Sequence, residues 1–337
     1  THGCTRGNAM PLLEVKDLEA RFAVRGGDLT ALRGVSFSLD TGERLVLVGE
    51  SGAGKSVAAF SILHLLARPG YIAAVPILFE GKDLAAMSER ELRKIRGNRI
   101  AMIFQDPMMT LNPVLTIGTQ MVEALKAHRR ISTRAARDIA LNKLRKVQIP
   151  SPDKRLDQYP HELSGGMRQR VIIAIALLLD PEIIIADEPT TALDVTIQAE
   201  IMALLLELCE QDNVALMLIT HDLGVVSQVT QRMLVMYSGR IIEQGPTREI
   251  INDAQHPYTQ GLINALPQMG EPGERLFQIP GSMPSLKNVP TGCPFHPRCS
   301  FATDECKRRM PEYVRSGNVD VACYEVSNLI EQAKRMQ

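Results

Sequence analysis

Apolar and polar positions alternate over residues 10–40, and short, almost wholly apolar runs replace that alternation further along the chain. A Gly-Gly-Asp step at 26–28 interrupts the alternating stretch, which therefore predicts two antiparallel strands joined by a turn. The apolar runs lie at 44–48, 183–188 and 214–219 and are typical of strands that are buried on both faces of a sheet. The pattern predicts an α/β fold with an added antiparallel part.

Stretches with helical periodicity lie between the predicted strands. They cover residues 57–66, 116–147 and 194–210. Ser132 or Thr133 is placed to cap a second helix inside the long middle stretch. Further strands are predicted at 77–79 and 99–104, with a charged helix between them, and at 232–237 and 240–244, as a hairpin around Ser238-Gly239.

The composition changes beyond residue 251, where prolines recur from Pro257 to Pro297 and break any long element. We expect a main cassette over 10–251 and a small, loop-rich C-terminal region over 252–337, held together by something other than a large core. Residues 1–9 look unlike the rest of the chain, and a clean strand pattern starts at Met10. We therefore expect 1–9 to be an expression remnant before a native start.

The charge balance argues against a nucleic-acid partner. Lys+Arg and Asp+Glu are both 38 among 337 residues, whereas nucleic-acid-binding chains usually carry a basic excess. The longest apolar run, 171–179, is far shorter than the ~18 residues of a membrane span, and no signal segment opens the chain. We expect a cytosolic protein in which disulfides are disfavoured.

A glycine-rich loop follows the strand at 44–48 and leads into a helix. Its residues are Gly49, Glu50, Ser51, Gly52, Ala53, Gly54, Lys55 and Ser56. This is the Walker A pattern in the strand–loop–helix context that it requires, so a merely structural glycine turn is the weaker interpretation. Backbone N–H groups would face phosphates, Lys55 would reach the β- and γ-phosphates, and the Ser56 hydroxyl is placed for Mg²⁺.

A second loop of this kind opens the helix that follows Leu163, with the sequence Ser164-Gly165-Gly166. Two glycines leave N–H groups uncovered at the positive end of the helix, and the serine adds a hydroxyl donor, which together make an anion site. A serine N-cap with glycines for close packing explains the same residues equally well. One chain thus carries two helix ends suited to phosphate.

Acidic residues end the buried strand at 183–188. Asp187 suits a Walker B role beside magnesium, and Glu188 suits a general base for the water that attacks the γ-phosphate, because ligands of open α/β sheets collect at strand carboxyl ends. His221 follows the strand at 214–219 and should reach the same sheet edge. A lone histidine is more often structural, but this position favours a γ-phosphate role.

Of the six cysteines in the chain, four lie close together in the C-terminal region. They are Cys293, Cys299, Cys306 and Cys323, spaced C-x5-C-x6-C-x16-C. A metal centre explains them better than disulfides in the cytosol, and four thiolates suit zinc or an iron–sulfur cluster. The absence of a C-x2-C pair leans away from zinc without excluding it. Cys4 and Cys209 are left out of this site.

The motifs stand in the order found in an ABC transporter ATPase. Gly49–Ser56, Gln105, 163–169, 183–188, 192–194 and His221 resemble that family's Walker A, Q-loop, signature, Walker B, D-loop and H-switch. The resemblance covers about residues 12–251. In the tail, His256-Pro257-Tyr258-Thr259, Ile279-Pro280-Gly281 and the segment 292–299 resemble the ATPase subunits of bacterial dipeptide and oligopeptide importers of the DppD/OppD type.

The resemblance implies a RecA-like α/β core, an antiparallel β subdomain and a helical subdomain near 117–179. It implies ATP and Mg²⁺ as ligands, with Gln105 joining Ser56 and Asp187 at the metal and Asp194 of the D-loop among the residues that bind the nucleotide. It also implies a head-to-tail pair of ATPases, in which Ser164, Gly165 and Gly166 act on the partner's ATP. Phe22 is the candidate for stacking on adenine, although it could instead belong to the core.

The same resemblance implies partners and a place in the cell. The second ATPase would be an identical chain or a paralogue, and two membrane permease subunits would insert short helices near 105–115. An extracytoplasmic binding protein would deliver the solute, and the ATPase would lie peripherally at the cytoplasmic face of the inner membrane. The resemblance also favours a [4Fe–4S] cluster, rather than zinc, at the four C-terminal cysteines.

Other functions remain open at this point. Nickel and other small-solute importers share the cassette, although many of their ATPases lack the cysteine tail. Soluble ABC ATPases act in translation, where two cassettes per chain are usual, or in DNA repair, where long coiled coils separate Walker A from the signature. This chain has one cassette and no such insertion, so the expected function is a peptide-importer ATPase without a nucleic-acid partner.

Overall fold

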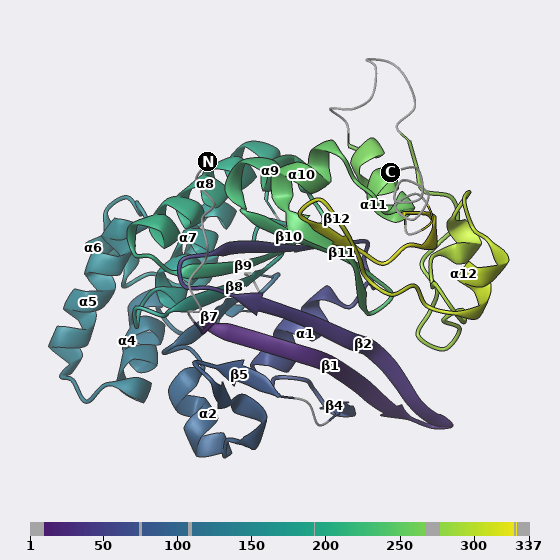
Figure 1. Ribbon diagram of the computed structural model, residues 1–337. Coiled ribbons are helices and arrows are strands. Elements are labelled where there is room, and N and C mark those ends of the chain that lie inside the picture. The colour runs from purple at the N-terminus through teal and green to yellow at the C-terminus, as the bar shows by residue number, and fades with distance from the viewer. Residues whose placement is uncertain are drawn as a thin grey trace.

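The computed structural model describes residues 10–73, 76–106, 110–191, 193–266, 277–326 and 328. The predicted expression remnant, Cys4 and Ala192 of the D-loop lie outside these ranges. Two sheets form the body of the described protein, with the longest strands, β1 and β2, in the smaller sheet (Figure 1). That sheet comprises β1 (Leu13–Val24), β2 (Gly27–Leu39), β4 (Gly70–Ile72), β5 (Ile77–Phe79) and β6 (Lys82–Asp83).

The smaller sheet confirms the antiparallel hairpin that the alternating pattern predicts. β1 pairs with β2 along most of its length, from Leu13 opposite Leu39 to Val24 opposite Gly27. Arg25 and Gly26 form the turn between Val24 and Gly27, and Gly26 has φ 103°, which glycine adopts without strain.

The larger sheet has the order β12-β13-β11-β10-β3-β9-β8-β7, and its centre is parallel. Its strands are β3 (Arg44–Val48), β7 (Ile100–Ile103), β8 (Ile183–Asp187), β9 (Ala215–Thr220), β10 (Arg232–Tyr237), β11 (Arg240–Pro246), β12 (Val314–Ser316) and β13 (Val319–Val321). Five of these match predicted strands closely, and the 240–244 strand continues two residues further. The last two, β12 and β13, have no counterpart in the sequence predictions.

Residues of the central strands alternate between two hydrophobic cores. On β3, Leu45 and Leu47 pack into the core shared with the smaller sheet and α1 (Lys55–Ile62), whereas Val46 and Val48 pack into the core on the opposite face. All four are fully or almost fully buried. Because both faces of this strand are covered, neither set of alternating side chains faces water. Its sequence is therefore a continuous apolar run.

Helices cover the second face of the large sheet and extend away from it. α7 (Gly165–Ala176) and α8 (Val195–Gln211) pack there, and α4 (Ile117–His128), α5 (Thr133–Lys146) and α6 (Pro152–Arg155) project to the left in Figure 1. Ser132 caps α5, since its hydroxyl accepts a hydrogen bond from the Ala135 N–H at 3.2 Å. The other helices of the cassette are α2 (Glu89–Ile95), α9 (Leu223–Val229) and α10 (Thr247–Asn252), with short 3₁₀ turns at Leu84–Ala86 and Pro160–Glu162.

The C-terminal region does share the main core, contrary to the expectation from its composition. It contains α11 (Pro257–Asn264), a 3₁₀ turn at His296–Arg298, α12 (Asp304–Arg308) and the β12–β13 hairpin, which adds to the large sheet through β11. Phe295 is buried and meets Tyr237 of β10 edge to face, with ring centroids 5.3 Å apart. Proline spacing shows where regular elements stop, but it does not show what the intervening loops pack against.

None of the helices within the described ranges has the length and apolar character needed to cross a membrane.

Candidate nucleotide site

The loop between β3 and α1 has the shape that the Walker A pattern predicts. Gly49 has φ 154°, and a Cβ there would lie 2.3 Å from the carbonyl oxygen of Met236, so only glycine fits. Gly54 has φ 107° and begins α1. The Lys55 Nζ donates to the carbonyl oxygens of Gly49, at 2.8 Å, and Glu50, at 3.1 Å. The Lys55 side chain therefore reaches back across the loop to its first two residues.

Lys55 is buried beside three carboxylates. Burial lowers the pKa of its ammonium group, and the nearby charges of Glu188, Asp187 and Glu50 oppose that shift. Only 5% of Lys55 is exposed. A cation held in place among carboxylates, with backbone carbonyls as its present acceptors, can exchange those acceptors for phosphate oxygens.

Asp187 lies at the end of β8, buried next to Ser56. Burial raises the pKa of the Asp187 carboxyl, and the Ser56 hydroxyl, which hydrogen-bonds to it, acts in the opposite direction. Its Oδ1 atom is buried without a hydrogen-bond partner among the described residues. Leaving a buried carboxylate oxygen unsatisfied costs about 1–3 kcal/mol, which a bound cation would recover. The residues present therefore fit Mg²⁺.

Glu188 receives contacts from three separate segments. Gln105 Nε2 and Thr191 Oγ1 each donate to its Oε2 atom at 2.9 Å, and His221 Nδ1 lies 3.3 Å from its Oε1 atom. Its backbone has φ 45°, in the left-handed region that non-glycine residues seldom occupy. The structure thus brings Gln105, Glu188 and His221 together, as the sequence predicts, and adds Thr191, which the sequence analysis missed.

These residues surround one open cavity of about 790 Å³. Lys55, Ser56, Gln105, Glu188 and His221 lie along it, and so does Phe22 of β1, the predicted adenine-stacking residue. Its other lining residues are Ala31, Ser51, Gly52, Gly54, Val57, Met283, Pro284, Ser285 and Leu286. Positive charge, carboxylates and an apolar wall therefore meet in a space large enough for a nucleotide.

The signature residues stand apart from this cavity. Ser164 caps α7, with its hydroxyl accepting from the Met167 N–H at 3.3 Å. A Cβ added at Gly165 would lie 3.3 Å from Leu193, and one at Gly166 would lie 3.0 Å from Ile197. Both glycines therefore allow close packing against the start of α8, where Asp194 is the N-cap residue. The packing interpretation holds within this chain, and an anion role stays a prediction.

The C-terminal region reaches the cavity, which the sequence analysis did not foresee. Residues 283–286 line it, and Arg298 forms an ion pair with Glu50 of the Walker A loop. Tyr258 contributes a hydroxyl that accepts from the Glu50 N–H at 2.8 Å. Arg298 and Glu50 are 248 positions apart, so local spacing carries no signal of this contact.

The four C-terminal cysteines line one small pocket of about 20 Å³. None of them forms a disulfide. Burial raises the pKa of the Cys293 thiol to about 11, with smaller contributions in the same direction from Cys306, Cys323 and Cys299. Within the described ranges, no three His, Cys, Asp or Glu side chains form a group that could hold a metal ion as they stand. The cysteines gather, but the predicted metal site is not formed.

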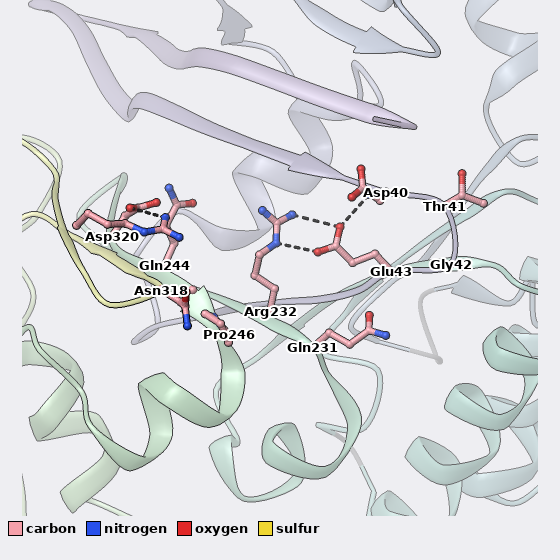
Figure 2. Close-up of a pocket in the computed structure, with 12 residues that line it drawn as sticks. Asp40, Thr41, Gly42, Glu43, Gln231, Arg232, Gln244, Pro246, Asn318 and Asp320 are labelled. Atoms are coloured by element: carbon pink, nitrogen blue, oxygen red, sulfur yellow. Dashed lines mark hydrogen bonds and ion pairs between the residues drawn. The ribbon is translucent and has the colours of Figure 1, made fainter. Parts of the chain in front are cut away.

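A larger cavity of about 920 Å³ lies at the other end of β3 and β10, beside the β12–β13 hairpin. Figure 2 shows Arg232 and Glu43 facing each other, and they form an ion pair at 2.8 Å. Arg315 and Asp320 form a second ion pair at 2.8 Å. The twelve lining residues include none of the predicted nucleotide residues. Both of its arginines are already paired with carboxylates, so it offers no candidate site.

Comparison with protein families agrees with this geometry. The family described as ABC transporter matches residues 32–191, and the family described as oligopeptide/dipeptide transporter, C-terminal region, matches residues 242–306. The first match contains the Walker A loop, the signature and Glu188. The second contains Tyr258, Arg298 and three of the four clustered cysteines.

Characterised relatives resemble the chain over nearly its whole length. The dipeptide transport ATP-binding protein DppD of Bacillus subtilis is 49% identical over 326 residues, covering 96% of this chain and 97% of the relative. The oligopeptide transport ATP-binding protein OppD of the same organism is 52% identical over 293 residues, covering 86% of this chain and 82% of the relative. DppD of Haemophilus influenzae is 45% identical, covering 95% and 97% of the two chains.

Solved structures resemble the cassette part. A dimeric structure of MJ0796, described as a bacterial ABC transporter cassette, superposes with a TM-score of 0.63 at 29% identity, covering 70% of this chain and 99% of that one. Fold and site together define an ABC-type ATPase. The chain belongs, more narrowly, to the dipeptide and oligopeptide transport ATP-binding proteins of the ABC transporter family.

Proposed function

We propose that this ATPase is the motor subunit of a bacterial importer for dipeptides or oligopeptides. One observation carries the proposal: the Walker A lysine, Glu188 and His221 line one cavity, with the Walker B aspartate hydrogen-bonded to Ser56 of its wall, in a chain that matches peptide-transport ATPases almost end to end. In such a machine, ATP binding and hydrolysis at a head-to-tail ATPase pair drive two permease subunits, and an external binding protein supplies the solute.

The residues of the cavity have distinct roles in this proposal. Lys55 and the loop N–H groups bind the phosphates, while Ser56, Asp187 and Gln105 would hold Mg²⁺, which neutralises phosphate charge when bound. Glu188 takes the proton from the attacking water. His221 and Gln105, which already contact Glu188, orient its carboxylate and sense the γ-phosphate.

Ser164, Gly165 and Gly166, with Asp194 nearby, serve the neighbouring chain's nucleotide. Their distance from this chain's own cavity supports that assignment, because a helix N-terminus with a serine hydroxyl suits an anion that another subunit brings. The cassette extends over 10–251, with a helical subdomain over about 117–179, and the C-terminal region over 252–337. The second ATPase is an identical chain or a paralogue.

Uptake measurements test the proposed substrate. A strain lacking this gene should lose uptake of labelled dipeptides or oligopeptides, and the wild-type gene, but not the Glu188→Gln variant, should restore it. Loss of nickel uptake with normal peptide uptake would favour the alternative of a nickel importer. Purification with DNA or ribosomes, and without integral membrane proteins, would contradict the transport function.

We also propose that Cys293, Cys299, Cys306 and Cys323 bind a structural [4Fe–4S] cluster. Their common pocket supports this, and four thiols are the donor set that such clusters use. The pocket must widen for a cluster to enter, and the thiols must lose their protons, which the raised pKa values of Cys293, Cys299 and Cys323 oppose in the absence of a cation. When bound, the cluster would cross-link the loops of the region.

Anaerobic purification tests the cluster directly. The protein should be brown, absorb broadly near roughly 400 nm and contain iron and sulfide, as thiolate-bound clusters do. Replacing any one of the four cysteines by serine should bleach it, whereas Cys209→Ser should not. Colourless protein with one zinc per chain would retain the metal site and refute the cluster.

A further inference from the structure

The C-terminal region touches the Walker A loop at one residue through two different groups. Arg298 forms a two-pronged ion pair with the Glu50 carboxylate, with nitrogen–oxygen distances of 2.7 and 3.0 Å. Tyr258 accepts a hydrogen bond from the Glu50 N–H. The Arg298 side chain is only 5% exposed, so this contact is far less screened by water than a surface pair.

Arg298 binds a second segment at the same time. Its Nε atom donates to the Pro280 carbonyl oxygen at 2.7 Å, and its Nη2 atom lies 3.4 and 3.5 Å from the carbonyl oxygens of Ile279 and Gly281. Gly281 has φ 74°, which turns the chain around the guanidinium group. One side chain therefore joins the Walker A loop to the segment that enters the nucleotide cavity two residues later.

The segment after Gly281 supplies the cavity with a wall that is mostly apolar and carries one hydroxyl group. Residues 283–286 line it together with Phe22, and a Cβ added at Gly52 would lie 3.9 Å from the Met283 sulfur, which places Met283 against the Walker A loop. The lysine, the carboxylates and His221 occupy the phosphate end. An apolar wall with one serine hydroxyl suits the adenosine part of a nucleotide better than its phosphates.

We propose that the C-terminal region completes the nucleotide site of its own chain. In this arrangement, residues 283–286 contact the adenosine moiety of ATP, and Arg298 is the positioning residue that fixes this wall and Glu50 relative to each other. The inference rests on the ATP site proposed above. It makes the C-terminal region part of the ATP site in addition to any role in holding the four cysteines.

Equilibrium binding of ATP and of inorganic tripolyphosphate separates the two parts of the proposal, since tripolyphosphate lacks adenosine. Met283→Ala should weaken ATP binding several-fold and leave tripolyphosphate binding unchanged, because it removes apolar contact with adenosine only. Arg298→Ala should weaken both ligands roughly tenfold, because it releases the Walker A loop as well as the wall. The KM for ATP should rise while kcat at saturating ATP changes little.

Further variants distinguish loss of the Arg298–Glu50 contact from a general loss of folding. Glu50→Gln breaks the ion pair from the cassette side and leaves Arg298 bound to 279–281, so it should weaken both ligands as well. Glu50→Gln combined with Arg298→Ala should cost less than the sum of the two single changes. Arg309→Ala removes an exposed ion pair with Glu305 in the same region and should leave both affinities unchanged. Arg298→Lys should bind both ligands more tightly than Arg298→Ala but more weakly than the wild type. Lysine keeps the positive charge but cannot donate two parallel hydrogen bonds to the Glu50 carboxylate.

The outcomes are distinct. Unchanged ATP binding in Met283→Ala, or equal weakening of ATP and tripolyphosphate, overturns the adenosine wall. Wild-type affinities in both Arg298→Ala and Glu50→Gln overturn the positioning role. Failure of the wild-type protein to bind ATP would instead overturn the proposed ATP site, and the ion pair would then be purely structural.

Discussion

The two glycine-rich helix ends of this protein look alike in sequence and differ in what surrounds them. The Walker A loop has its own lysine, with Glu188 and His221, around one cavity, and the neighbouring Asp187 has an unsatisfied oxygen within the described residues. The signature end of α7 has an N-cap serine and glycines packed on α8, away from that cavity. The first has most of the groups that a phosphate site uses, and the second has only the helix end and its cap.

This difference teaches that a helix N-terminus alone does not define a phosphate site. Both ends offer N–H groups and a positive dipole, which contribute typically less than about 1 kcal/mol toward an anion at an exposed position. What distinguishes Walker A is the buried charge next to it. We therefore expect changes to the Walker side to act within one chain and changes to the signature to act between chains.

The largest expected effect is a loss of turnover when the proposed base, Glu188, is replaced at the cavity beside the Walker A loop. Glu188→Gln keeps the side chain's size and its hydrogen bonds but cannot take a proton, so turnover should fall by about 10²–10⁴-fold while ATP still binds. Steady-state hydrolysis and ATP binding by calorimetry measure the two quantities. Near wild-type turnover would show that Glu188 is not the base.

The next largest effect tests whether the signature acts on a neighbour. Ser164→Ala removes one donor to the γ-phosphate and should lower turnover by up to about 10²-fold. If the chain pairs with itself, mixing Ser164→Ala with Glu188→Gln produces dimers in which one of the two sites is intact, so activity should recover well above either variant alone. Mixing that restores nothing would place the signature's action within its own chain.

A smaller effect should appear on dilution of the wild-type protein. In the proposed two-chain site each nucleotide uses the neighbour's signature, so specific ATPase activity should rise with protein concentration, or when the partner subunits are added, over the range in which sedimentation shows dimers forming. Constant, full activity in a demonstrated monomer would contradict the two-chain site.

The smallest effect is expected at the polar cavity of Figure 2. Arg315 is 61% exposed and pairs with Asp320, so Arg315→Ala should leave turnover and melting temperature within experimental error. A marked loss of ATPase activity would mean that this cavity has a role that its ion pairs do not reveal.

Much of the cassette was predictable because its signals are local. The strand from Arg44 to Val48, the loop after it and the acids after Ile183 are each defined by a few consecutive residues. The convergence of Gln105, Glu188 and His221 was also predictable, because parallel strands bring their carboxyl ends to one edge. The roles of these residues in catalysis stay predictions until the variants above are measured.

The C-terminal contributions were not predictable from spacing. β12 and β13 are three residues each, too short for a period of two to be recognised, and the Arg298–Glu50 pair joins distant parts of the chain. Prolines and glycines in this region indicate loops. Loop sequences have no hydrophobic periodicity, so they do not indicate which surface the loop packs against. Thr191 was missed because a single threonine after Asp187 and Glu188 forms no motif of its own, and its contact with Glu188 depends on the shape of the loop.

The β12–β13 hairpin has a consequence for how the chain is made. β13 pairs with β11 through Glu243 opposite Val321 and Gln244 opposite Asp320, so the neighbour of β11 is synthesised well after β11 itself. Until it has been made, the outer edge of β11 lacks this neighbour, and exposed strand edges promote aggregation. Closure of the large sheet therefore waits until residues near 320 have emerged from the ribosome.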